Sequence, residues 1–141
     1  MILSLLFRGL SKSVKGLTDM DGVQLAAAMA EGVTTAYGAV MKPAEGTVLT
    51  VSRLAAARAV EAAQENPSAE YVLEQAIAAG YETLAQTIDM NPVLKKAGVV
   101  DAGGKATSSF WTACCGLCGA RLCPRWRRTA KRTRTRRISA P

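Results

Sequence analysis

The sequence feature that most limits the fold is the spacing of its apolar residues, which recur at three- and four-residue steps over much of the first hundred positions. In residues 21–41 these steps join Val23, Ala26, Ala30, Val33, Tyr37 and Val40. This period places the apolar side chains on one face of an α-helix. Because no clear period-two stretch accompanies it, the sequence predicts an all-α fold.

Proline, glycine and capping residues divide this pattern into separate helices. Asp21 with Gln24 three residues later is an acceptable capping box for a first long helix. Pro43 and Gly46 interrupt the pattern, which resumes through Val48 and ends at Asn66 and Pro67. A third helix is expected from Ser68 and a short one over 92–97, before a glycine-rich exit. The result is a bundle of amphipathic helices over residues 1–105.

The chemistry available to this body is limited. It has no histidine, HExxH motif, P-loop or paired cysteines, and its alanine-rich helices favour close packing. Two polar interruptions remain as candidate sites, MKPAEGTVLT (41–50) and VVDAGG (99–104). On pattern alone, each segment can be explained as a simple connection between helices.

Basic residues are concentrated at the C-terminus. Residues 105–141 hold ten of the eighteen Lys and Arg and no acidic residue, whereas residues 1–104 carry eight basic and eleven acidic side chains. The net charge of +7 therefore comes from the tail. Any nucleic-acid-binding hypothesis concerns the tail alone.

The N-terminal segment MILSLLFRGL has no positive charge before its apolar run and no small-residue cleavage site, so it is a poor signal peptide. No segment approaches the roughly twenty apolar residues that span a bilayer. We expect a cytoplasmic protein without stable membrane insertion.

Three segments carry a resemblance to a known family: ILSLLFRGLSKSV, DGVQLAAAMAEGVTTAYGAVMKPAEGTVLTVSRLAAA and NPVLKKAGVVDAGG. Together they resemble the N-terminal, ATP-binding kinase domain of bacterial fatty acid kinase, which is similar to the L domain of dihydroxyacetone kinases. The resemblance implies a helical barrel with ATP and Mg²⁺ at one end. It also implies phosphoryl transfer to a fatty acid that a separate fatty-acid-binding protein presents.

The same resemblance implies site residues. The loop that would line the nucleotide comprises Met41, Lys42, Pro43, Glu45, Gly46 and Thr47, and the segment that would close the same end comprises Asp101, Gly103 and Gly104. Gly46 would allow close backbone approach, and the Thr47 hydroxyl could donate a hydrogen bond. Purely structural roles stay open: a turn at Gly46 and helix caps at Thr47 and Asp101.

The chain also departs from the family. The family's Asp-rich Mg²⁺ loop and Gly-Asn-Ser-Gly phosphate loop precede the matching segment, and this chain has neither. Asp19 and Asp21 are its only close acidic pair before the first long helix, where acidic residues are ordinary caps. We therefore expect a kinase domain without its first catalytic segment, with no metal ligands or catalytic residues and no activity alone. Dihydroxyacetone kinase activity and a non-catalytic helical module with a basic binding tail are the alternatives.

Read literally, the tail supports three hypotheses. Four cysteines within CCGLCGARLC (114–123) could bind zinc, although two spaced CxxC pairs are lacking. The run RWRRTAKRTRTRR (125–137) could bind nucleic-acid phosphates. The third hypothesis is a disordered basic extension, because nothing after Cys123 could bury a core.

A fourth hypothesis is translation in the wrong frame. Trp and Cys codons begin with TG, so reading one base earlier turns each into NTG, which encodes Leu, Met or Val. Positions 111, 114, 115 and 118 then become apolar at the spacing of one helix face. With suitable codons the basic run becomes acidic, which resembles the family's acidic linker. We therefore interpret residues 106–141 as a frameshift-derived disordered tail with no nucleic-acid partner.

Overall fold

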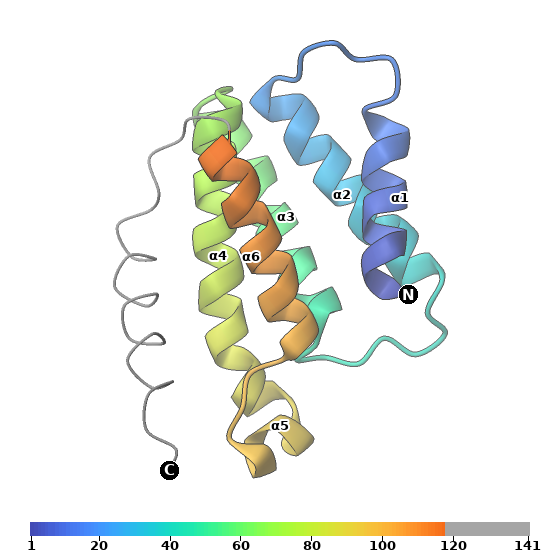
Figure 1. Ribbon diagram of the computed structural model, residues 1–141, viewed down its shortest axis with the longest axis vertical. Coiled ribbons are helices and arrows are strands. Elements are labelled where there is room, and N and C mark those ends of the chain that lie inside the picture. Colours follow the sequence, from blue (N-terminus) through green and yellow to red (C-terminus); the bar gives the residue numbers. More distant parts are fainter. Residues whose placement is uncertain (118–141) are drawn as a thin grey trace, which may run out of the picture.

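The computed structural model describes residues 1–117, which form six α-helices and no strand (Figure 1). The helices are α1 (Ile2–Ser13), α2 (Gly22–Gly38), α3 (Val48–Glu65), α4 (Ala69–Met90), α5 (Pro92–Ala97) and α6 (Ala102–Leu117). The predicted all-α fold is confirmed. Within the described part, no helix is both long and apolar enough to cross a bilayer.

The five long helices run side by side and alternate in direction, while α5 extends from one end (Figure 1). Helix α1 packs on α2, α2 on α3, α3 on α4, and α6 lies along α3 and α4. The main core gathers residues of α2, α3, α4 and α6, among them Met29, Ala59, Val72, Ile77 and Cys115. Alanines supply much of this core, as the composition of the helices led us to expect.

Local signals in the sequence set the helix ends. At the start of α2, Gln24 Oε1 accepts a hydrogen bond from the Asp21 N–H at 3.1 Å, as a capping box requires. The Asn91 side chain caps α5 by accepting from the Val93 N–H at 3.0 Å. Helix α5 ends at Gly98, whose φ of +64° lies in the left-handed region that glycine favours.

Two glycines allow α1 and α2 to touch backbone to backbone. A Cβ atom at Gly9 would lie 2.7 Å from the Gly32 Cα, and one at Gly32 would lie 2.6 Å from the Leu6 carbonyl oxygen. Real Cβ atoms essentially never approach other atoms so closely. The crossing of α1 and α2 therefore requires residues without a side chain.

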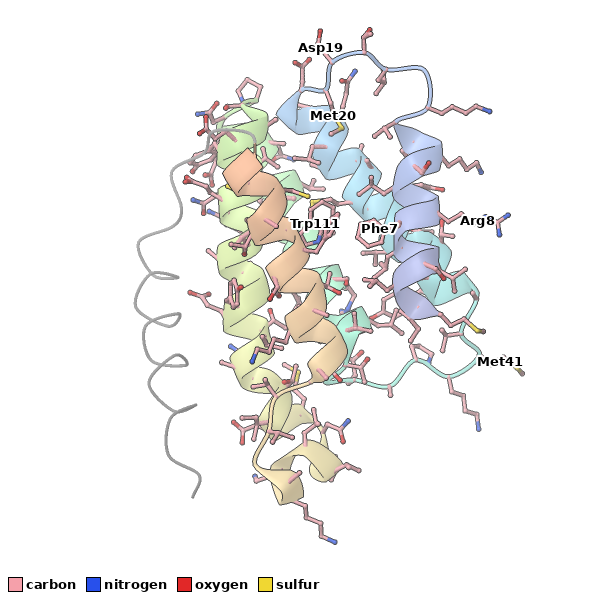
Figure 2. The ribbon with its side chains drawn as sticks, in the orientation of Figure 1. Phe7, Arg8, Asp19, Met20, Met41 and Trp111 are labelled. Carbon is pink, nitrogen blue, oxygen red and sulfur yellow. The ribbon has the colours of Figure 1, made fainter. Side chains whose placement is uncertain are left out.

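Aromatic side chains connect α1 to α6. The Phe7 ring lies 4.6 Å from the Phe110 ring at 70° and 6.2 Å from the Trp111 ring, measured between centroids. Phe7 and Trp111 lie between the two helices in Figure 2. Beside them is a small cavity with mostly apolar walls, which Ser52 also lines; the Ser52 hydroxyl group is buried and has no hydrogen-bond partner.

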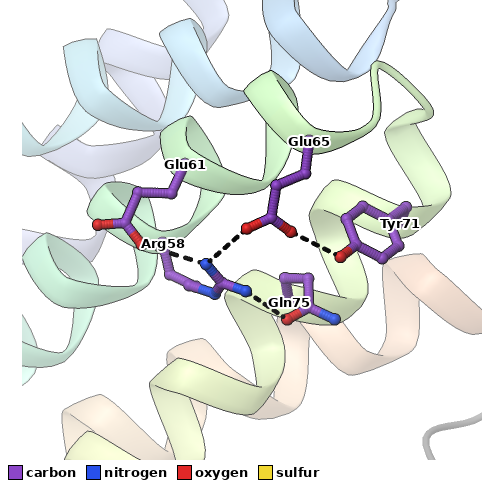
Figure 3. A network of polar contacts seen from close by, with 5 residues as sticks. All are labelled: Arg58, Glu61, Glu65, Tyr71 and Gln75. Atoms are coloured by element: carbon purple, nitrogen blue, oxygen red, sulfur yellow. Dashed lines mark hydrogen bonds and ion pairs between the residues drawn. The ribbon is translucent and has the colours of Figure 1, made fainter.

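A polar network joins the outer faces of α3 and α4 (Figure 3). The Arg58 guanidinium donates to Glu61 at 3.2 Å, to Glu65 at 3.5 Å and to Gln75 at 3.1 Å, while the Tyr71 hydroxyl donates to Glu65 at 2.8 Å. The hydrogen bond to Glu61 raises the pKa of Arg58, and the one to Glu65 raises the pKa of Tyr71. Because the network is exposed to solvent, it adds little to stability.

Helix α6 continues twelve residues past Lys105, where the sequence analysis ended the helical body. Its buried residues fall on one face and are mostly small or hydroxylated: Gly104, Thr107, Ser108, Thr112 and Cys115. Thr107 and Thr112 donate to the carbonyl groups four residues earlier, at 3.0 and 2.8 Å. The apolar pattern missed this helix because its buried face is polar. The remainder of the predicted tail, residues 118–141, lies outside the described residues.

Replacing Gly32 by alanine should separate α1 from α2, because the added methyl group would overlap the Leu6 carbonyl oxygen. We expect Gly32→Ala to lower the free energy of unfolding by about 2 kcal/mol. Gly38→Ala in the same helix is the matched control, since nothing lies within 4 Å of its Cβ position. It should leave stability within about 1 kcal/mol of the parent. Urea unfolding followed by circular dichroism measures both, and equal effects would contradict the proposed contact.

Candidate functional site

The two polar segments that the sequence singled out meet at one end of the bundle, where α3 and α6 both begin (Figure 1). A Cβ atom at Gly103 would lie 3.2 Å from the Val48 Cβ, so the first turns of these helices are in contact. The loop before α3 also packs against the end of α4, through Gly46 and Met90. Positions some 55 residues apart in sequence therefore form one surface.

Gly46 is required by the fold whether or not a ligand binds. Its φ is +72°, and a Cβ there would lie 2.9 Å from the Met90 Cβ and 3.1 Å from the Asn91 backbone nitrogen. Thr47 occupies the N-cap position of α3, and its hydroxyl donates to the Ala44 carbonyl at 2.8 Å. The turn that the sequence left open is thus present at Gly46, whereas Thr47 stands at the N-cap position without a side-chain capping hydrogen bond.

The first part of the loop makes a smaller contribution to this surface. Met41 is fully exposed and points into solvent in Figure 2, and both Lys42 and Pro43 are exposed. The structure therefore brings Gly46 and Thr47 to the starts of α3 and α6 but leaves these three side chains outside the packed region.

Asp101 caps α6. Its Oδ2 accepts a hydrogen bond from the Gly104 N–H at 2.7 Å, and its own backbone N–H donates to the Thr87 hydroxyl at 3.3 Å. Gly104 allows close packing, because a Cβ there would lie 2.9 Å from Val51 Cγ2. No local sequence pattern marks Thr87 as a site residue, because it is fully buried in α4.

Thr50, the last residue of the candidate segment 41–50, and Arg53 beyond it were not named as site residues, although both belong to the loop's hydrogen-bonding network. The Thr50 hydroxyl accepts from the Gly46 N–H at 3.1 Å and donates to Glu45 Oε2 at 2.8 Å. Arg53 forms an ion pair with the same carboxylate oxygen at 3.3 Å. Thr50 is 1% exposed and its bond with the Gly46 N–H is buried, whereas the Arg53 and Glu45 side chains are about half exposed.

The starts of α3 and α6 present open hydrogen-bond donors. Within residues 1–117, the backbone N–H groups of Val48, Leu49, Ala102 and Gly103 have no acceptor, as is usual in the first turn of a helix. The helix dipoles add partial positive charge at the same place. This arrangement suits an anion such as a phosphate group.

Carboxylates do not gather there as magnesium would require. Among residues 1–117 no group of three His, Cys, Asp or Glu side chains could hold a metal ion. Glu45 and Asp101 are each hydrogen-bonded as described above. Asp19 lies at the opposite end of the bundle from Met41 (Figure 2), and Asp21 begins α2 there.

Two of the four cysteines lie in the described part. Cys115 is buried in the core and Cys114 is half-buried beside it on α6. The zinc hypothesis also needs Cys118 and Cys123, and the basic run 125–137 follows them. These positions lie outside the described residues.

Comparisons with known proteins identify a family model and several relatives that match this chain. Residues 1–116 match the model of the DAK2 domain. The chain is 47% identical over 104 residues to an uncharacterized protein of Staphylococcus haemolyticus and 46% identical over 108 residues to one of Staphylococcus saprophyticus. A Staphylococcus aureus relative is 45% identical over 104 residues. Each match covers 74% of this chain but 19% of the relative, so the chain spans about a fifth of their length.

Replacing Gly46 by alanine should distort the loop before α3. The left-handed backbone costs any L-residue about 1 kcal/mol, and overlap with Met90 and Asn91 should add about 2 kcal/mol. Gly98→Ala is the control, because Gly98 also has positive φ but nothing lies within 4 Å of its Cβ position. Thermal and urea unfolding of both variants measure the difference. A loss at Gly46 no larger than at Gly98 would mean that the loop does not pack as described.

Proposed function

The chain belongs to the DAK2 domain family, and we propose that it is the nucleotide-binding part of an ATP-dependent phosphotransferase of the dihydroxyacetone kinase and fatty acid kinase family. The observation that carries the proposal is that the loop 41–47 enters α3 beside residues 101–104, where Val48 packs on Gly103 at one end of a DAK2-type helical bundle. These are the segments that the sequence resemblance assigns to the nucleotide.

The proposed site binds the phosphates of ATP through backbone groups. Four open N–H groups at the starts of α3 and α6 would donate to phosphate oxygens, and the two helix dipoles favour the negative charge. The Thr47 hydroxyl is not an available donor for these phosphates, because its proton already bonds to the Ala44 carbonyl group. The chain's part in the reaction is then to bind and orient the nucleotide.

Magnesium does not fit the described residues. The acidic side chains near the proposed site are Glu45, Asp89 and Asp101, and each has a partner within the chain: Thr50 and Arg53, Lys95, and the Gly104 N–H respectively. We therefore derive no metal-dependent step from this chain. Without the metal and phosphate loops of the family, we expect residues 1–141 not to turn over ATP.

The sequence resemblance also suggests which molecule accepts the phosphoryl group. We propose a fatty acid carboxylate, presented by a separate fatty-acid-binding protein and converted to an acyl phosphate. Dihydroxyacetone is the alternative acceptor. Co-elution of this chain with a lipid-loaded fatty-acid-binding protein in size-exclusion chromatography favours the first, because dihydroxyacetone phosphorylation requires no such carrier.

Nucleotide binding can be mapped with ¹⁵N-glycine labelling of the whole chain. On titration with ATP we expect amide shifts at Gly46, Gly103 and Gly104, which lie at the proposed site. Gly16 and Gly22 serve as internal controls, because the loop that joins α1 to α2 and the start of α2 lie at the opposite end of the bundle from the starts of α3 and α6 (Figure 1). Shifts confined to the control glycines, or none at millimolar ATP, would contradict the site. A separate assay should show no Mg²⁺-dependent ATP turnover above a blank preparation.

We also propose that a frameshift after Lys105 changed the side chains that α6 carries. Ser108 supports this, because it is 3% exposed and its hydroxyl has no hydrogen-bond partner. Burying a hydroxyl in this way is unfavourable. Read one base earlier, a TCN serine codon gives an apolar residue at the same buried position.

Sequencing the DNA across codons 104–107 tests the frameshift. We expect the alternative frame to stay open to the end of the tail and to encode apolar residues at positions 108, 111 and 115. A stop codon within a few codons of that frame would show that the literal sequence is the native one.

A further inference from the structure

The turn before α3 is held by one buried side chain. Thr50 is the third residue of α3 and is 1% exposed, yet its hydroxyl reaches back to Gly46 and Glu45. In a common capping box the third helical residue bonds the N–H of the N-cap residue. Here it bonds the N–H of Gly46, one residue earlier, and so fixes the chain before the helix begins.

The hydrogen-bonding capacity of Thr50 is committed to this turn. Its single proton goes to Glu45 Oε2 at 2.8 Å, and its oxygen accepts the Gly46 N–H at 3.1 Å. Arg53, one turn further along α3, bonds the same Glu45 oxygen at 3.3 Å and offsets its charge. Three residues of α3 and its loop thus hold the turn in one conformation.

The consequence concerns the candidate nucleotide site. The Gly46 N–H is occupied by Thr50 and is unavailable to a phosphate, whereas the N–H groups of Val48 and Leu49 remain open. The turn determines where these open groups lie relative to the start of α6, because Gly46 packs on Met90 and Val48 packs on Gly103.

We propose that Thr50 is a positioning residue for nucleotide binding, acting by holding the Glu45–Gly46 turn so that the open N–H groups of α3 face the start of α6. Arg53 supports it by holding Glu45. The inference rests on the proposed function for its nucleotide, whereas the anchoring of the turn can be measured without any ligand.

The test compares Thr50→Val, which keeps the shape but removes the hydroxyl, with Thr50→Ser, which keeps the hydroxyl. Hydrogen exchange of the Gly46 amide should be about tenfold faster in Thr50→Val and nearly unchanged in Thr50→Ser. The dissociation constant for ATP, measured on the whole chain, should rise about tenfold in Thr50→Val only. Unchanged Gly46 exchange in a folded Thr50→Val variant would overturn the proposal.

Thr112→Val controls for a merely structural effect. Thr112 is also a buried helical threonine, bonded to the Ser108 carbonyl at 2.8 Å, but it belongs to the later part of α6. It should lower the melting temperature without changing Gly46 exchange or ATP affinity. If Thr112→Val weakens ATP binding as much as Thr50→Val does, Thr50 has no positioning role. The parent chain could bind no ATP while Thr50→Val still accelerates hydrogen exchange at Gly46. In that case the proposed function and the positioning role both fail, and only the anchoring of the turn by Thr50 is supported.

Discussion

Close contact between helices that carry small side chains is the constraint on which the bundle depends. Ala28, Ala36, Ala59 and Ala62 are completely buried, and the α1–α2 crossing brings the Gly32 Cα to within 2.7 Å of a Cβ position at Gly9. Each small residue buries little apolar area, so stability comes from many short-range contacts. Such contacts tolerate little added volume, because protein interiors are close-packed.

The same close packing forms the candidate site. Gly103 and Gly104 let the start of α6 approach Val48 and Val51 of α3, and Gly46 lets the preceding loop approach the end of α4. Two helix N-termini therefore open at one end of the molecule. The carboxylates nearby are bonded within the chain, and the open N–H groups in the first turns of these helices can donate to an anion. Binding and orientation, more than acid–base chemistry, are what this surface can supply.

Much of the fold could be predicted because local rules determine it. The three- and four-residue period indicated α2, α3 and α4. Pro67 and Pro92 fall where helices begin or end, and Pro43 lies in the loop between α2 and α3. Helix α6 was different. Its buried face presents Thr107, Ser108 and Thr112. In a hydropathy pattern these polar residues suggest a loop, and only the packing of α6 against α3 and α4 explains why they form a buried helix face.

The sequence by itself determined that the described chain is helical and where most helices begin and end. It also indicated two polar segments as candidate sites. These features could be predicted because capping, proline geometry and helical period act over a few residues. Tertiary structure decided that those segments lie together and that Gly46 is needed for packing. It also decided that Thr50, Arg53 and Thr87 belong to the site region. The physical reason is that these roles depend on contacts between distant helices, such as Gly46 with Met90 and Asp101 with Thr87, which no local pattern encodes.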